Sequence, residues 1–274
     1  MPRHLSILLC VTILLLIIPA SVLAVSSTNY YKENGKIYDD WDICRTDGTG
    51  EDGFFQISQT GFRPIIVGES LGENADKAYR VGEQFNDNYP DMHQRAEKIF
   101  IFARDTIRYT SDKNQFNFEE FAQNADELAT TIQDEGVAYG DCEDYAVLLA
   151  VIYKGAGFRS AIVMPPNHAA TLVYLPEYKK ANQRLSIDGE PGWIWAEATG
   201  GNNPLGWMPE RFMGSRLSAF EIENEAITGL ETSEKPATTV TKSKGNSRVH
   251  ISPFFIVIGL MGLFPLFRRR RGVS

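Results

Sequence analysis

The chain has 274 residues, of which 43% are hydrophobic and 23% are charged, proportions that are ordinary for a globular protein. Of its 27 basic residues, five lie in the two ends, 1–24 and 268–274, which leaves 22 basic against 35 acidic side chains in residues 25–267. Such an acidic body argues against a nucleic-acid-binding protein, whose affinity comes from Lys and Arg, and we expect no nucleic-acid partner. Three cysteines without a CxxC pair argue against a scaffold built on disulfides or zinc.

The chain begins with the three regions of a secretory signal peptide. Arg3 and His4 precede an apolar run from Leu5 to Ile18, and Val22-Leu23-Ala24 fits the small-residue rule of a cleavage site. We therefore expect residues 1–24 to be removed. The alternative is an N-terminal anchor that stays uncleaved.

Residues 25–85 form an N-terminal extension of mixed character. Turn dipeptides occur at Asn34-Gly35, Asp47-Gly48 and Asp52-Gly53, between short stretches that contain aromatic pairs. Short strands and an irregular extension both fit this pattern. The end of the extension, from Ala75 to Asn86, predicts a helix.

Residues 86–220 predict a folded domain of the α+β class. Helices are expected first and strands afterwards, an order that differs from the alternation of βαβ folds. The expected helices cover 91–109 and 118–134, a further helix follows Asp141, and the expected strands cover 160–164, 168–175 and 193–199.

The C-terminal part predicts attachment to a membrane. Residues 221–250 are rich in Thr, Ser, Lys and Glu and predict a flexible stalk. The uncharged segment 251–267 is near the short limit for crossing a bilayer, and the four arginines in 268–274 predict a cytoplasmic tail. We expect a single-pass protein of the cell membrane with its folded domain outside the cytoplasm. The segment also resembles C-terminal sorting signals of prokaryotic surface proteins.

One cysteine stands at the start of a predicted helix. Asp141 is a suitable N-cap, which puts Cys142 in the first turn. The free amides of a helix N-terminus lower the pKa of a thiol and can hold an oxyanion. We therefore expect Cys142 to be a nucleophile, with the acidic Glu143 and Asp144 pointing away from its reactive side.

A cysteine nucleophile needs a base, and the base needs an acceptor on its other ring nitrogen. His168 opens a predicted strand, whereas His93 begins a helix and has the character of a surface residue. Glu197 lies on the next predicted strand and can face His168 if the two strands pair antiparallel. Asp188 is the other nearby acid, but its position before a glycine is typical of a turn.

These residues resemble the transglutaminase-like superfamily of cysteine enzymes over roughly residues 90–215. The resemblance implies a papain-like core in which the nucleophile helix packs on an antiparallel sheet. The family usually has Asp at the position of Glu197. The stretches that carry the resemblance are Ile107–Asp112, Gly140–Ala146 around the cysteine, Gly157–Ala161, Asn167–Ala169 around the histidine, and Trp195–Thr199 around the acid.

The resemblance implies an acyl-enzyme mechanism on amide bonds of a peptide or protein substrate. Cys142 attacks the carbonyl, His168 protonates the leaving group, and Tyr109 is the candidate for an additional oxyanion donor. Water as the acceptor makes a protease or amidase, and an amine makes a transglutaminase. No cofactor and no metal are expected, because Glu143, Asp144 and His168 lack further ligands at suitable spacing.

Substrate-binding residues are expected after the acid strand. Trp195, Trp207 and Asn203 are candidates for the wall of a groove, and core packing is the alternative for Trp193 and Trp195.

Two other functions compete with catalysis. The domain can be a surface binding module without turnover, or Cys44 and Cys142 can form a structural disulfide that abolishes nucleophilic attack. The reactivity of the thiol distinguishes these alternatives.

Overall fold

A computed structural model of the chain mixes helices with sheets, which confirms the α+β class. The structure describes residues 27, 29–58, 61–72 and 77–223. The predicted signal peptide 1–24, the segment 251–267, the tail 268–274 and the stalk from residue 224 onward lie outside this part of the chain. Within the described residues, no helix has the length and apolar character needed to span a bilayer.

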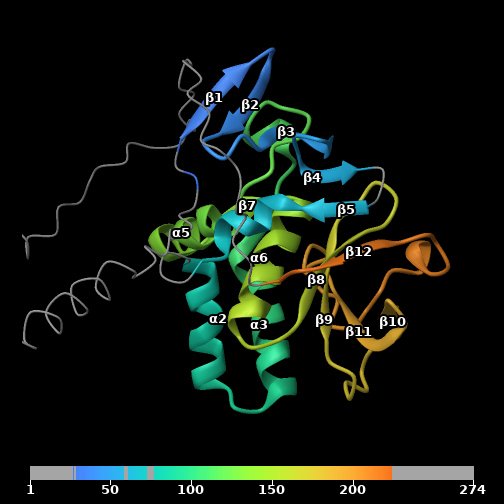
Figure 1. Cartoon of the computed structure of the whole chain (residues 1–274). Coiled ribbons are helices and arrows are strands. Elements are labelled where there is room, and N and C mark those ends of the chain that lie inside the picture. The colour runs from blue at the N-terminus through green and yellow to red at the C-terminus, as the bar shows by residue number, and fades with distance from the viewer. Residues whose placement is uncertain (1–26, 28, 59–60, 73–76, 224–274) are drawn as a thin grey trace, which may run out of the picture. The chain divides into compact units, whose positions relative to one another are not determined.

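The N-terminal extension contains strands, which decides between the two alternatives left by its sequence (Figure 1). Asn34 and Gly35 form the first hairpin turn with φ angles of 50° and 85°, a conformation that asparagine and glycine adopt readily. The sheet follows chain order, as β1 (Tyr30–Glu33), β2 (Lys36–Asp39), β3 (Cys44–Gly50), β4 (Gly53–Ser58) and β5 (Gly61–Pro64).

The helices lie between this sheet and a second one in the sequence. They are the 3₁₀ helix η1 (Ile65–Ser70), α2 (Lys77–Asn88), α3 (Met92–Thr106), α4 (Asp112–Gln115), α5 (Ala125–Glu135) and α6 (Cys142–Gly155). The helix expected over 118–134 begins later, because Asn124 caps α5 by accepting the N–H of Glu127 at 2.8 Å while the Glu127 carboxylate accepts the N–H of Asn124 at 2.9 Å.

The helix expected over 91–109 ends at Thr106. The next three residues form β6 (Ile107–Tyr109), which pairs in parallel with β7 (Ala138–Gly140) just before α6. The apolar spacing continues through Ile107, so the sequence pattern does not mark this change.

The second sheet is antiparallel throughout. Its order is β10 (Arg184–Ile187), β11 (Glu190–Ala196), β9 (Ala170–Tyr174), β8 (Ser160–Met164) and β12 (Ser218–Glu221). Asp188 and Gly189 turn β10 into β11 with φ angles of 50° and 84°, as their turn character predicts. Because Ala196 pairs with Thr171, the end of β11 lies beside the start of β9.

Helix α6 is the central element of the described structure. Every residue from Glu143 to Tyr153 is buried, since α2, α3 and α5 pack against α6 together with the strands β8 and β9 (Figure 1). A helix that is apolar over most of its circumference is stable only when it is covered on all sides. At the N-terminus of α6, Cys142 is partly exposed.

Helices α2 and α6 approach each other closely at two glycines. A Cβ atom at Gly82 would collide with the carbonyl oxygen of Ile152, and one at Gly155 would collide with the carbonyl oxygen of Tyr79. Backbone contact of this kind requires the absence of a side chain.

The boundary expected between residues 85 and 86 therefore falls inside α2, a helix that belongs to the packed core.

A buried arginine joins the first sheet to the helices. Arg45 is completely buried on β3 and forms ion pairs with Asp39 at 2.7 Å, with Glu69 of η1, and with Glu127 of α5 at 3.3 Å. Its guanidinium also donates to the carbonyl oxygen of Ala122 at 3.3 Å. Removing one partner of such a cluster leaves uncompensated buried charge, so the extension and the helices form one folded unit.

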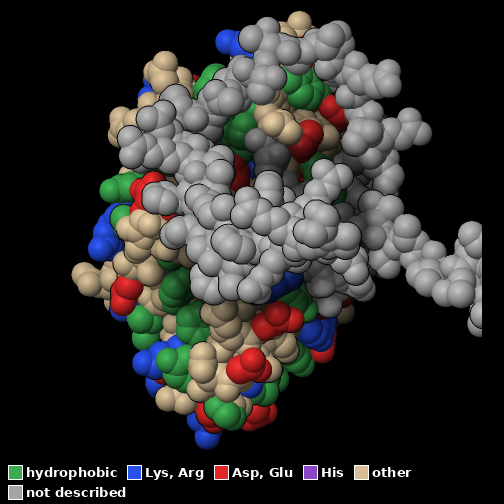
Figure 2. Space-filling model, turned by 90° about the vertical axis from the view of Figure 1, so that its left-hand side faces the viewer, with side chains coloured by type: hydrophobic (Ala, Val, Ile, Leu, Met, Phe, Trp, Pro, Cys, Tyr) green, Lys and Arg blue, Asp and Glu red, His purple; other side chains and the backbone are tan. Residues whose placement is uncertain are grey.

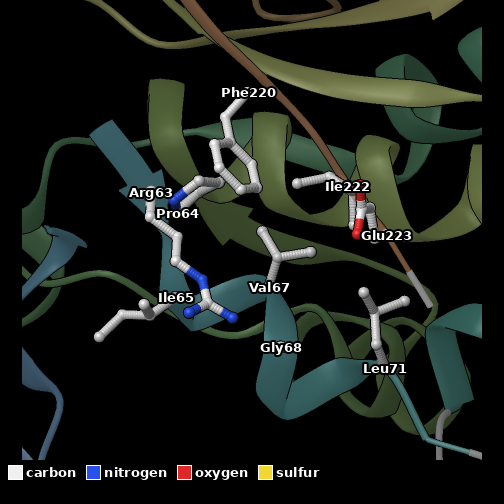
Figure 3. A pocket seen from close by; sticks show the side chains of 9 residues that line it. All are labelled: Arg63, Pro64, Ile65, Val67, Gly68, Leu71, Phe220, Ile222 and Glu223. Carbon is white, nitrogen blue, oxygen red and sulfur yellow. The ribbon is translucent and has the colours of Figure 1, made fainter. Parts of the chain in front are cut away.

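Two further views locate the surface features. Figure 2 shows Lys and Arg interspersed with Asp and Glu over the described part of one face. A small cavity has a volume of about 50 Å³. Figure 3 shows Phe220 of β12 and the following Ile222 above Val67 of η1 and Leu71 at this cavity. No residue of the candidate active site lines this cavity.

Gly155→Ala should destabilise the protein by about 1–3 kcal/mol, because the new methyl group meets the backbone of α2. At an unhindered helical position the same change would favour the helix by about 1 kcal/mol. Urea unfolding measures the difference. Gly61→Ala is the control, since a Cβ there meets nothing within 4 Å; equal stability of both variants would contradict the close helix contact.

Candidate active site

The turn before α6 is held by a buried carboxylate. Asp144 accepts the backbone N–H of Gln123 at 2.7 Å, the side-chain amide of Gln123 at 2.8 Å, and the N–H of Asp141 at 3.3 Å. A side chain at Gly140 would collide with Asp144. Gly140 and Asp144 therefore fix the conformation that places Cys142 at the first position of α6, as predicted.

His168 and Glu197 form a hydrogen-bonded pair at the edge of the second sheet. The distance from His168 Nε2 to Glu197 Oε1 is 2.8 Å, and the His168 side chain is 12% exposed. The pairing of β9 with β11 brings the two residues together, as the sequence spacing predicts. The longer glutamate arm therefore reaches the histidine where the resembling family has Asp.

Three further groups hold Glu197 in place. Its carboxylate accepts the indole N–H of Trp195 at 3.0 Å and the hydroxyl of Thr199 at 2.7 Å, and its carbonyl oxygen accepts the side-chain amide of Asn203 at 2.8 Å. Burial alone would raise the pKa of Glu197, but the hydrogen bonds from His168, Thr199 and Trp195 lower it. The ionised carboxylate accepts the Nε2 proton of His168 and leaves Nδ1 available as a base.

The thiol of Cys142 lies next to the histidine loop. The backbone N–H of Ala169, the residue after His168, is close enough to the sulfur to favour its thiolate form. The thiol itself donates to Glu143 Oε2 at 3.2 Å, and no hydrogen bond joins Cys142 to His168 among the described residues.

The charge around the thiol differs from the expectation. Burial raises the pKa of Cys142, and the nearby carboxyl groups of Glu143 and Asp141 raise it further. The expectation that both acids point away from the reactive side holds for Asp144 and was wrong for Glu143. Glu143 faces the sulfur, and Asp144 turns into the buried network with Gln123. In this conformation, burial and the carboxyl groups therefore raise the pKa of the thiol by more than the helix N-terminus lowers it.

Tyr109 lies beside the nucleophile turn. Its partner across the short parallel ladder is Gly140, two residues before Cys142, and its side chain is 58% exposed. Partial burial and the charges of Asp141, Cys142 and Glu143 raise its pKa. The phenol therefore keeps its proton and can donate a hydrogen bond near the sulfur.

The predicted groove residues have different environments. Trp195 is completely buried, so the alternative of core packing describes it, and its indole supports Glu197. Trp207 is 42% exposed and is free to contact a substrate. The side chain of Asn203 is engaged with the backbone of Glu197.

Two alternatives from the sequence are also resolved by position. Cys44 is a buried free thiol and Cys142 is a partly exposed one, so no disulfide joins them. His93 is exposed near the start of α3, where its ring contacts Tyr178 at 5.9 Å.

A cluster of carboxylates surrounds the start of α6. Ligand atoms of Asp112, Asp141 and Asp144 lie within 4.8 Å of one another, as do those of Asp112, Glu120 and Glu143. One buried oxygen each of Asp112, Asp141 and Glu143 has no hydrogen-bond partner. Sequence reasoning missed Asp112, since it lies about one helix and one strand before the cysteine and nothing local marks it as a ligand.

Burial and mutual repulsion control the protonation of this cluster. Burial, followed by the charge of Asp141, raises the pKa of Asp112 to about 7, and burial also raises the pKa values of Glu143 and Asp144 well above their ordinary range. A divalent cation would offset the repulsion. An all-oxygen donor set suits Ca²⁺ or Mg²⁺, so the reason given for expecting no metal, a lack of further ligands, does not hold.

Comparison with known proteins assigns the chain to no family. No family model matches the chain, and no curated protein matches it. The assignment of chemistry to this site therefore rests on its geometry and on the resemblance of its motifs.

Calcium should raise the melting temperature of the protein. Saturation to about 100 times the dissociation constant adds about 2.7 kcal/mol to the free energy of unfolding. Asp112→Asn should abolish this increase while raising the melting temperature in EDTA, because it removes a repelling charge. Glu119→Gln, at an exposed acid paired with Lys113, is the control; an equal calcium effect in Asp112→Asn would rule out the cluster as the binding site.

Glu143→Gln should increase the alkylation rate of Cys142 by iodoacetamide near neutral pH about tenfold, the effect of one pKa unit. The substitution replaces the carboxyl group that raises the pKa of the thiol and accepts its hydrogen bond by an amide that cannot ionise. Mass spectrometry of the modified peptides in EDTA measures the rate. Buried Cys44 serves as the internal control, and an unchanged or lower rate would show that Glu143 does not restrain the thiol.

Proposed function

We propose that this chain is a cysteine enzyme of the transglutaminase-like kind that cleaves or transfers acyl groups at amide bonds. The observation that carries the proposal is the 2.8 Å contact between His168 Nε2 and Glu197 Oε1, in a loop whose next residue, Ala169, contacts the Cys142 sulfur. The orienting acid thus holds the base, and the base lies on the loop that reaches the nucleophile, which supports acyl transfer.

The mechanism begins from a neutral thiol. Because the pKa of Cys142 is raised, the resting state is not a thiolate paired with an imidazolium. His168 Nδ1 takes the thiol proton as the sulfur attacks the carbonyl carbon, and Glu197 stabilises the positive charge on the imidazole. The proton then passes to the leaving amine, and an acyl-enzyme remains.

Two groups beside the nucleophile turn are candidate oxyanion donors. The first amides of α6 point out of its N-terminus, and Tyr109, whose backbone pairs with Gly140, carries a protonated phenol. Water or an amine then resolves the acyl-enzyme, giving hydrolysis or transamidation. The predicted signal peptide and C-terminal segment place this chemistry on the outer side of a cell membrane, with peptides or proteins as substrates.

A second candidate is a binding module on the same fold. The observation that favours it is the hydrogen bond from the thiol to Glu143, which withholds Cys142 from the base. The two functions differ in whether a covalent acyl-enzyme forms.

The full chain in detergent should form an acetyl-enzyme with p-nitrophenyl acetate. The acetyl group should map to Cys142, and His168→Ala should slow its formation about 100-fold or more, since a base in this role contributes at least that factor. His93→Ala is the matched control, because that histidine is exposed and contacts Tyr178, which follows the end of β9 opposite to His168. Equal acetylation rates in both histidine variants, or no adduct at Cys142, would leave the binding module as the better description.

A further inference from the structure

One face of the His168 ring is covered by an aromatic side chain. Phe212 lies in the 3₁₀ helix η2 (Glu210–Phe212), and its ring centroid is 5.3 Å from that of His168 with an interplanar angle of 14°. The two rings are therefore stacked. Phe212 is only 5% exposed, so it shields this face of the imidazole from solvent.

The segment that carries Phe212 is fixed by the strands beneath it. The N–H of Gly206 donates to the carbonyl oxygen of Trp195 at 2.9 Å. Asn182 clamps Met208 by accepting its N–H at 2.8 Å and donating to its carbonyl oxygen at 2.9 Å. Phe212 also contacts the Trp195 ring at 5.7 Å. These contacts hold the Phe212 ring in place against the second sheet.

A single hydrogen bond does not fix an imidazole ring. His168 can rotate about the line from Nε2 to Glu197 Oε1 while keeping that bond, and rotation swings Nδ1 away from the thiol. Glu197 is itself held by Trp195 and Thr199, but it contacts the imidazole at one nitrogen only. A parallel ring packed on the imidazole face opposes this rotation.

We propose that Phe212 is a positioning residue that holds the His168 ring in the plane from which Nδ1 can reach Cys142. The role rests on the proposed function, in which Nδ1 takes the thiol proton. Phe212 touches neither the substrate nor the reacting sulfur, and it acts through the histidine alone. It supplies the orientation that Glu197 leaves open.

The test uses the full chain and two independent readouts. The first is the rate of acetylation of Cys142 by p-nitrophenyl acetate. The second is the ¹⁵N spectrum of the His168 imidazole, in which a neutral ring held by Glu197 carries its proton on Nε2. The variants are Phe212→Ala, Phe212→Tyr, and Leu172→Ala, a buried side chain of the same apolar cluster.

The expected result separates positioning from packing. Phe212→Ala should slow acetylation about 10- to 100-fold, the range caused by small misplacements of a reacting group, and should replace the single Nε2–H signal by an average of the two tautomers. Phe212→Tyr keeps the stacked ring and should stay within about threefold of the unmodified chain. Leu172→Ala should lower the melting temperature with little effect on either readout.

Several outcomes would overturn the proposal. An unchanged tautomer signal and rate in Phe212→Ala would show that the ring only fills the core. Equal losses in Phe212→Ala and Leu172→Ala would assign the effect to stability. If His168→Ala shows normal acetylation, the proposed function fails, but the tautomer measurement still decides whether Phe212 orients the ring.

Discussion

The burial of helix α6 is the constraint on which the rest of the described structure depends. Its apolar residues face helices on one side and the second sheet on the other, so the three neighbouring helices and strands β8 and β9 must all meet it. Gly82 and Gly155 allow the closest of these approaches. Only the two ends of the helix are partly exposed, and Cys142 is its first residue. The same packing therefore builds the core and leaves Cys142, of the two cysteines in the described residues, partly exposed at the start of the helix.

Two groups of polar side chains with opposite hydrogen-bonding states flank Cys142. On one side, the Glu197 carboxylate accepts hydrogen bonds from His168, Trp195 and Thr199. On the other side, Asp112 and Glu143 carry buried oxygens that no donor reaches. Cys142 lies between them and shares its proton with the unsatisfied side. The protonation state of Cys142 therefore depends on both groups and not only on the helix N-terminus.

The sequence predicted the elements that have strong local patterns and missed those that depend on distant contacts. The apolar stripe over 91–109 predicted α3, although that helix ends at Thr106. The alternation near His168 and Glu197 predicted β9 and β11, although both residues lie just outside those strands. Apolar spacing and turn residues could predict these elements because they are local properties of the sequence. Strand β10 was missed because its residues alternate between exposed and half-buried positions and carry no apolar run. The orientation of Glu143 and the closeness of Asp112 depend on tertiary burial of charged side chains, which no spacing rule reports.

The ion cluster of Arg45 has a consequence for how this protein could have changed over time. Arg45, which pairs with Asp39, Glu69 and Glu127, lies in the first sheet. Glu69 and Glu127 belong to helices that pack against α6. A recombination event that exchanged the amino-terminal sheet alone would break this charge balance unless it supplied an arginine at the same place. A transplanted thiol-bearing core would therefore need the strands that carry Asp39 and Arg45, or a replacement cation for Glu69 and Glu127.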